Sequence, residues 1–231
     1  MNKLRSSFPK QYSFLPVIHV VNESQALTNA LLAEGEGADG VFLINHQIPA
    51  AELLHCYDKV RERLPNFWIG LNFLDLSPEH ALEIIPKTVS GLWSDNAGID
   101  EAAADPTAQA KSFKEFRVAI NWPGVYFGGV AFKYQTPVKN LTKVTSLALP
   151  LVDVITTSGP GTGLEASLVK IKRMKEAARS HPIALASGVT PENVYCYLPY
   201  VDCFLVATGI SDSHTQLNRF RVSKLARALK K

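Results

Sequence analysis

Two polar residues that could carry acid–base chemistry stand directly at the ends of apolar runs. Asp95 lies in GLWSDN (91–96), and His46 follows GVFLIN (40–45). Desolvation at the end of a buried strand can raise the pKa of a carboxyl group toward working pH, which makes Asp95 the candidate general base. The other interpretation of Asp95 is a carboxylate that caps the following loop. His46 is a candidate ligand or acid.

Lys133 follows the apolar run GVYFGGVAF (124–132) and is the third candidate catalytic residue. A lysine at this place could stabilise an oxyanion, hold a phosphate or form a Schiff base. It could also extend into solvent at the rim of the site. Nothing else in the sequence indicates an imine, so we favour electrostatic binding.

Glycine-rich segments end the last three apolar runs: SGPGTG (158–163), ASGVTPEN (186–193) and VATGIS (206–211). Glycine lets the backbone approach a ligand, and free N–H groups before a helix bind phosphate. One such glycine could simply end a strand, but three successive runs predict a phosphate site. GPGTG lacks the GxGxxG spacing and the downstream acid of a dinucleotide fingerprint. The predicted phosphate-binding residues are Gly159, Thr162, Gly163, Ser187, Gly188, Thr208 and Gly209.

His19, Asn45 and Asn72 are the predicted substrate-binding residues, because they lie near the ends of the first three runs. His19 could instead be a hydrogen-bonded core histidine. A divalent metal held by His19, His46 and Asp75 is a further alternative, although no HxH or HxxxH pair occurs. No other cofactor is expected. Four histidines are expected on helices or loops away from the site: His55, His80, His181 and His214.

The elements that must position these residues alternate along the whole chain. Near-continuous apolar runs are typical of strands buried on both faces, and helix-like segments separate them. Proline after a capping residue marks helix starts at Ser77-Pro78 and Thr190-Pro191, Asn22 caps another, and Leu164-Glu165 opens the next. The eight runs span 16–21, 40–45, 67–73, 91–96, 124–132, 152–158, 182–187 and 201–207.

Eight strand–helix units in 231 residues predict an α/β fold, a parallel (β/α)8 TIM barrel in a single domain over 1–231. An open doubly wound sheet is the alternative, although such sheets usually stop at about five or six strands. In a barrel the candidate residues would share one mouth. The acidic stretch 98–106 would be a lid or a solvated loop. The basic segment 219–231 fits the outer helix of the last unit better than a membrane or RNA contact.

Composition sets the expected partners. The net charge of +3 is too small to indicate nucleic-acid binding. No apolar stretch approaches the roughly 18–20 residues of a membrane span, and no leader pattern is present, so we expect a cytoplasmic protein. Cys56, Cys196 and Cys203 form no CxxC pair and are expected to be buried thiols. A homodimer is the expected assembly because it is the commonest one.

The C-terminal half resembles the BtpA-like family of TIM-barrel enzymes. The similarity rests on DVITTSGPGTG (153–163), PIALASGVTPENV (182–194), VDCFLVATGIS (201–211) and the lysine of VAFKYQ. The SGVTPEN turn is also similar to ribulose-phosphate-binding barrels such as phosphoribosylanthranilate isomerase. The resemblance implies ligand binding by the glycine-rich segments and a place at the mouth for Lys133. In the N-terminal half, the family's acid after the second strand is absent.

Three functional hypotheses follow. The first is an enzyme that acts on a small phosphorylated sugar or nucleotide-like substrate by isomerisation, lyase chemistry or phosphoribosyl transfer. The second is a non-catalytic barrel that binds a phosphorylated metabolite or serves as an assembly factor. The third, with the weakest support, is a metal-dependent hydrolase.

Overall fold

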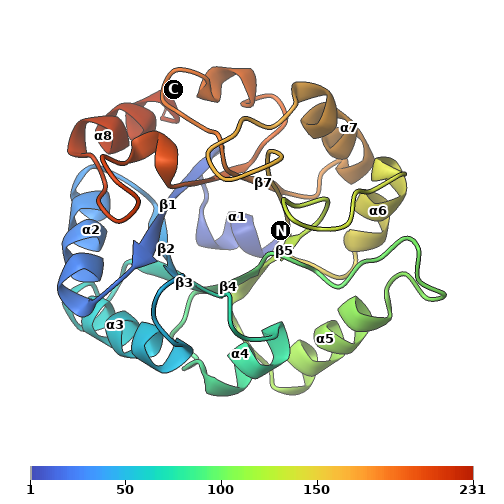
Figure 1. Cartoon of the computed structure of the whole chain (residues 1–231), viewed down its shortest axis with the longest axis horizontal. Coiled ribbons are helices and arrows are strands. Elements are labelled where there is room, and N and C mark those ends of the chain that lie inside the picture. Colours follow the sequence, from blue (N-terminus) through green and yellow to red (C-terminus); the bar gives the residue numbers. More distant parts are fainter. Residues whose placement is uncertain (1, 231) are drawn as a thin grey trace.

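Eight parallel strands close into one barrel in the computed structural model, which describes residues 2–230. Each strand pairs with its neighbours in sequence, and β1 pairs with β8 (Figure 1). The predicted TIM barrel is therefore confirmed, and the open sheet is excluded. The strands are β1 (Ser13–Val20), β2 (Gly40–Asn45), β3 (Trp68–Phe73), β4 (Gly91–Ser94), β5 (Val125–Gly129), β6 (Val154–Thr157), β7 (Ile183–Ala186) and β8 (Cys203–Val206).

Helices form a ring outside the barrel, as Figure 1 shows. The predicted helix starts are confirmed at Asn22 and Ser77, whose side chains accept hydrogen bonds from Gln25 N and His80 N. The helices are α1 (Lys3–Ser7), α2 (Glu23–Gly35), α3 (Ala50–Arg63), α4 (Pro78–Ile84), α5 (Ala108–Ala119), α6 (Leu141–Ala148), α7 (Leu168–Ala178) and α8 (Arg219–Ala228), with 3-10 helices η1 (Val194–Cys196) and η2 (Thr208–Ile210).

Alternate side chains of each strand pack on opposite sides of the barrel wall. In β1, Leu15 and Val17 point into the barrel, whereas Phe14 and Ile18 pack among the helices. Both faces are buried, which explains why the strands read as continuous apolar runs. The same alternation brings His19 to the inner face at the end of β1.

Aromatic rings fill the barrel interior. The ring of Phe42 makes edge contacts with Trp68, Trp93 and Phe127 at centroid distances of 5.2, 5.6 and 5.1 Å. Gly70 makes room for this cluster, because a Cβ atom there would lie 2.3 Å from the Phe42 ring. The interior is therefore a packed core below the mouth and not a channel.

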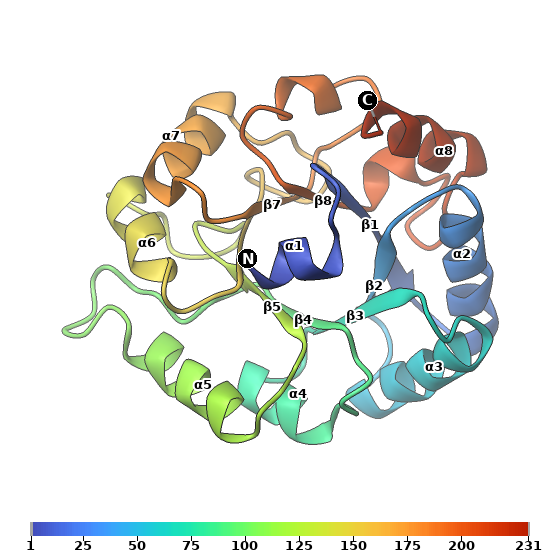
Figure 2. The ribbon, with the colours of Figure 1, turned by 180° about the vertical axis from the view of Figure 1, so that it is seen from behind.

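The short helix α1 lies across the N-terminal end of the barrel (Figure 2). Its Leu4 is fully buried, and the adjacent Phe8 packs on Trp68 at 5.3 Å between ring centroids. This end of the barrel is therefore covered by the chain itself, and the sequence analysis did not predict the helix that covers it.

Three local predictions are wrong. The segment after Thr190 forms only η1, because the Asn193 side chain binds Thr190 N and Gly188 O in place of a longer helix. Helix α7 begins at Leu168, four residues after Leu164. Cys196 is exposed, whereas Cys56 and Cys203 are buried as predicted.

The helices of residues 2–230 include none with the length and hydrophobicity that a membrane span requires.

Candidate functional site

A cavity of about 190 Å³ opens at the C-terminal mouth of the barrel. Its floor is apolar, formed by Val17, Ile44, Trp93 and Leu205. Polar residues from seven chain segments surround that floor. They are His19, His46, Asp95, Lys133, Tyr134, Thr162, Gly163, Ser187, Gly188, Thr208 and Gly209.

Asp95 extends into this cavity just beyond β4. Burial is the main influence on its carboxyl group and raises its pKa above the usual range. A hydrogen bond from Asn72 Nδ2 to Asp95 Oδ1 (3.2 Å) and the charge of Lys133 oppose that rise. Asp95 is thus a fixed carboxylate with an elevated proton affinity, as a general base requires.

Lys133, which follows β5, reaches the neighbouring loop after β6. Its Nζ donates to Thr162 Oγ1 at 3.1 Å, and its backbone N–H donates to Ser158 Oγ at 2.7 Å. The exposed Tyr134 hydroxyl lies 3.4 Å from the same Thr162 oxygen. One ammonium group and two hydroxyl groups therefore converge at one edge of the cavity.

Glycines of the loops after β6, β7 and β8 continue this edge around the cavity. Gly163 and Gly188 adopt positive φ angles of 74° and 67°, and neither N–H group donates to a backbone carbonyl within residues 2–230. A Cβ atom on Gly188 or Gly209 would come within 2.3 or 1.9 Å of a carbonyl oxygen. These glycines let the loops pack closely against the neighbouring backbone, while the N–H groups of Gly163 and Gly188 stay available to a small anion.

Three histidines meet at the other edge. The rings of His19 and His214 stack at 4.1 Å between centroids, and His46 lies 4.7 Å from His19 and 5.5 Å from His214. The expectation that His214 lies away from the mouth is wrong. Asp75 is outside this cluster, because its carboxylate accepts hydrogen bonds from Asn45 Nδ2 (2.6 Å) and Ala50 N (3.1 Å).

The surroundings at the mouth favour the neutral forms of His19 and His46. Burial, followed by the charges of His214, His46 and Lys133, lowers the pKa of His19 to about 3. Burial also lowers the pKa of His46, with His214 and Lys133 contributing. A neutral imidazole can accept a proton or bind a metal, but it is a poor proton donor.

Three predicted site residues lie outside the cavity lining. Asn72 is buried beside the cavity, where its side chain binds Asp95. Asn45 lies on the helix-facing side of β2 and binds Asp75, which does not line the cavity. Gly159 is buried in the wall and donates its N–H to Ser187 Oγ at 3.0 Å. The contacts of Asn72 and Gly159 position Asp95 and Ser187 of the lining, and direct contact of Asn45, Asn72 and Gly159 with a ligand stays a prediction.

Sequence reasoning did not identify Trp93, Tyr134 or His214 as site residues. In the sequence, Trp93 has the pattern of a core residue within an apolar run. Tyr134 follows Lys133, and the sequence analysis gave a role only to the lysine. A signal for His214 was present: it follows the last strand, and every loop after a barrel strand lies at the mouth.

The shape of the chain matches solved TIM barrels. Phosphoribosyl anthranilate isomerase from Thermus thermophilus aligns with a TM-score of 0.67 and 18% identity, over 94% of this chain and 98% of that one. The structure of (S)-3-O-geranylgeranylglyceryl phosphate synthase from Thermoplasma acidophilum, in complex with substrate sn-glycerol-1-phosphate, aligns with a TM-score of 0.67 and 12% identity. The alignment covers 99% of this chain and 96% of that one.

Tryptophan synthase from M. tuberculosis aligns at a TM-score of 0.68 and 9% identity, over 99% of this chain and 100% of that one. These identities show a shared fold. No protein-family model and no curated protein matches the sequence.

Proposed function

We propose that the mouth cavity binds a small phosphorylated sugar or nucleotide-like metabolite. The phosphate lies between Lys133 and Thr162 on one side and Gly188 and Gly209 on the other. Ser187, Thr208 and the N–H of Gly163 complete its hydrogen bonds.

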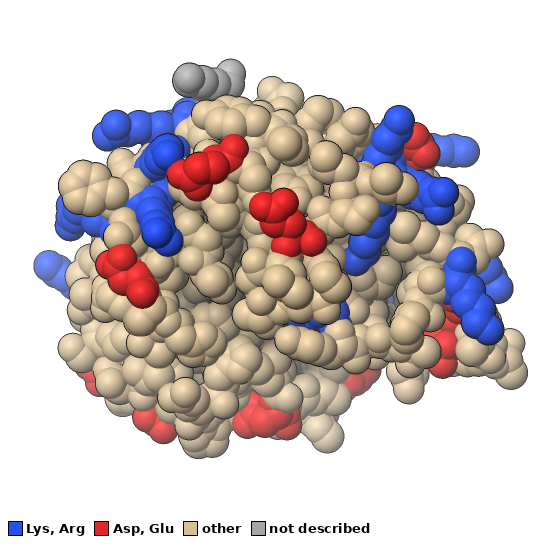
Figure 3. Space-filling view, turned by 45° about the horizontal axis from the view of Figure 1, so that its top comes forward, with Lys and Arg blue, Asp and Glu red and all other residues tan. Residues whose placement is uncertain are grey.

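The observation that carries this proposal is the convergence of three glycine-rich loops and one lysine on a single cavity. The volume of about 190 Å³ is smaller than the roughly 300–1,000 Å³ of most drug-sized ligand pockets, so a small ligand is favoured. On the face drawn in Figure 3, basic and acidic side chains both occur. Selection for an anion therefore depends on the residues of the cavity itself.

The same arrangement supports catalysis. Asp95 acts as the general base, Lys133 stabilises the negative charge that develops on the substrate, and neutral His46 accepts a hydrogen bond from the substrate. Isomerisation, lyase chemistry and phosphoribosyl transfer each use a base and an anion-stabilising group. Barrels of the same fold include an isomerase and a synthase whose names specify phosphorylated compounds, which supports the proposal. Membership of the BtpA-like family is part of it.

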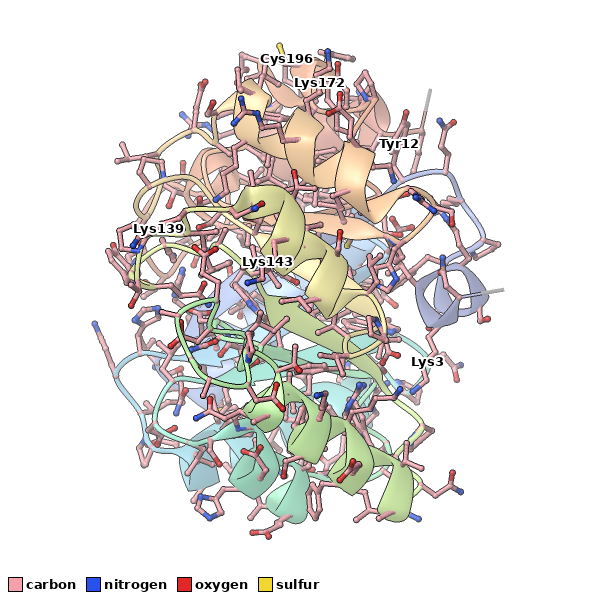
Figure 4. All side chains as sticks on the ribbon, turned by 90° about the vertical axis from the view of Figure 1, so that its right-hand side faces the viewer. Lys3, Tyr12, Lys139, Lys143, Lys172 and Cys196 are labelled. Carbon is pink, nitrogen blue, oxygen red and sulfur yellow. The ribbon has the colours of Figure 1, made fainter. Side chains whose placement is uncertain are left out.

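A thermal-shift screen tests the binding claim. Inorganic phosphate, phosphorylated sugars and nucleotides are each compared with unphosphorylated counterparts. A ligand at about 100 times its Kd should raise Tm by roughly 5–10 °C in a chain of this size. The Lys133→Met variant should lose most of this shift. Lys172→Met is the matched control, because Lys172 is an exposed residue of α7 outside the cavity lining (Figure 4).

A second comparison separates an enzyme from a binding protein. For an enzyme, Asp95→Asn abolishes turnover of a ligand found in the screen but leaves its affinity unchanged. Stabilisation by unphosphorylated compounds to the same extent, or a wild-type shift retained in Lys133→Met, would contradict the phosphate site.

A further inference from the structure

We propose that His19, His46 and His214 bind one Zn²⁺ ion at the rim of the mouth cavity, with a fourth coordination position open toward the cavity. This inference goes beyond the phosphate site and does not depend on it. It uses three histidines outside the phosphate-binding edge, and for His46 it replaces the hydrogen bond to the substrate proposed above with metal coordination.

The distances suit a three-histidine site. One ring nitrogen of each histidine lies within 4.8 Å of the others. A tetrahedral zinc site with Zn–N bonds of about 2.0–2.1 Å needs nitrogens roughly 3.3 Å apart. His46 and His214 are exposed, so rotation of these two side chains can supply the remaining approach toward the fixed His19.

His19 provides an independent indication that a polar ligand belongs here. The residue is only 8% exposed, and its Nδ1 atom is buried with no hydrogen-bond partner among residues 2–230. Buried polar atoms in folded proteins nearly always have a partner. Stacking against His214 satisfies neither ring nitrogen, whereas coordination of a metal gives the His19 ring a polar partner.

The loop that carries His214 is held in place by a buried amide. Asn29 of α2 donates from Nδ2 to Thr215 O (2.8 Å) and accepts at Oδ1 from Leu217 N (3.1 Å). Gln25 donates to Thr215 O at 2.5 Å and to His19 O at 3.2 Å. One helix therefore fixes both His19 and the His214 loop, as supporting residues do around metal sites.

The ligand set indicates the kind of metal and its open position. Three imidazole ligands suit zinc and related transition metals better than Mg²⁺ or Ca²⁺, which prefer oxygen ligands. Zinc sites with three protein ligands keep a fourth position for water or substrate. His19 and His46 both line the cavity, so that position faces the proposed substrate. With no carboxylate in the set, the bound ion favours an anionic fourth ligand.

Isothermal titration with Zn²⁺ of chelator-treated protein tests this site. The measurement uses a Cys196→Ser background, because the exposed thiol could bind zinc on its own. We expect one zinc per chain. His214→Ala removes a ligand from an exposed loop and should weaken zinc binding at least about 100-fold, beyond the loss seen for supporting residues. His80→Gln, on exposed α4 surface, should change affinity less than about twofold.

The proposal is overturned if the Cys196→Ser protein binds no zinc, or if His214→Ala binds it as tightly as the background. Equal losses in His214→Ala and His80→Gln would also overturn it. Phosphate binding measured by thermal shift with chelator present tests the other site separately. Either site can therefore fail without the other.

Discussion

The N-terminal end and the C-terminal mouth of the barrel both contain a cavity. The two differ in how many polar groups of the lining side chains have a hydrogen-bond partner. The groove at the N-terminal end is the larger, at about 570 Å³. Its Arg61 donates to the carbonyls of Pro65 and Phe67, and its Asp39 binds Phe14 N and Lys10 Nζ. These charged groups already serve the fold.

At the mouth, polar atoms that are buried without a hydrogen-bond partner among residues 2–230 occur in and beside the lining of the smaller cavity. Examples are His19 Nδ1, Asn72 Oδ1 and Trp93 Nε1. Asp95 keeps a raised pKa there, and Gly163 and Gly188 keep backbone N–H groups directed at no backbone carbonyl within residues 2–230. Unpartnered buried atoms also occur toward the N-terminal end, on Ser13, Arg117, Trp122 and His181, but none of these residues lines the groove there. The comparison teaches that unused hydrogen-bonding capacity in the cavity lining itself marks the candidate site better than cavity volume does.

The largest expected effect on stability is at the N-terminal end. Asp153 accepts hydrogen bonds from buried Arg117 (2.9 Å) and from Tyr126 N (2.8 Å), with Lys3 3.6 Å away. Asp153→Ala leaves the guanidinium group unpaired and should lower the free energy of unfolding by about 3 kcal/mol, measured by urea denaturation. Phosphate affinity should not change. A loss of phosphate affinity in a protein that remains folded would contradict the assignment of stability to the N-terminal end and of binding to the mouth.

At the mouth, the zinc site depends on Gln25 for the position of the His214 loop. Gln25→Ala keeps all three histidines and should weaken zinc binding about tenfold, measured by titration calorimetry. Ser24→Ala, which changes an exposed residue of the same helix, is the control. Unchanged affinity in Gln25→Ala would show that α2 does not position the ligands.

Thr162 contributes a hydroxyl group to the phosphate edge. Thr162→Val keeps the side-chain shape and should weaken inorganic phosphate binding about fivefold, or roughly 1 kcal/mol, in the thermal-shift titration. Thr142→Val, on the exposed surface of α6, should leave it unchanged. If the two variants bind phosphate equally well, Thr162 is not a ligand.

The smallest effect is a gain of stability at Asp95. Its raised pKa means that the folded state disfavours the ionised carboxylate. The contribution of Asp95 to the free energy of unfolding is therefore most favourable at low pH, and it is lost as the pH rises above the pKa that the group has in the unfolded chain. Asp95→Asn keeps an acceptor for Asn72 and should raise Tm by about 2 °C at pH 7. The gain should vanish near pH 4. Equal Tm values at both pH values would remove the evidence for a destabilised carboxylate.

Much of this architecture could be predicted from the sequence. The continuous apolar runs matched buried strands, with β2 predicted to the residue over 40–45. Glycine-rich loops after β6, β7 and β8 do line the mouth. Both signals are local in the chain, since a few neighbouring residues determine them.

The remaining features depend on tertiary contacts. His214 reaches the site because Asn29, 186 residues before Thr215, binds the carbonyl oxygen of Thr215 in the same loop. Helix α1 covers the barrel end through Leu4 and the adjacent Phe8, in a segment too short to show a helical period along the sequence. Asn45 and Asn72 bind the carboxylates of Asp75 and Asp95, which their positions at strand ends alone do not reveal.

Amide NMR during titration with inorganic phosphate tests the central claim most directly. Both ends of the barrel are then observed in one experiment on the unmodified protein. We predict that the amide signals of Gly163, Gly188 and Gly209 shift and saturate together, while those of Lys10 and Arg61 stay in place. Shifts confined to Lys10 and Arg61, or no saturable shift at the three glycines, would contradict a phosphate site at the mouth.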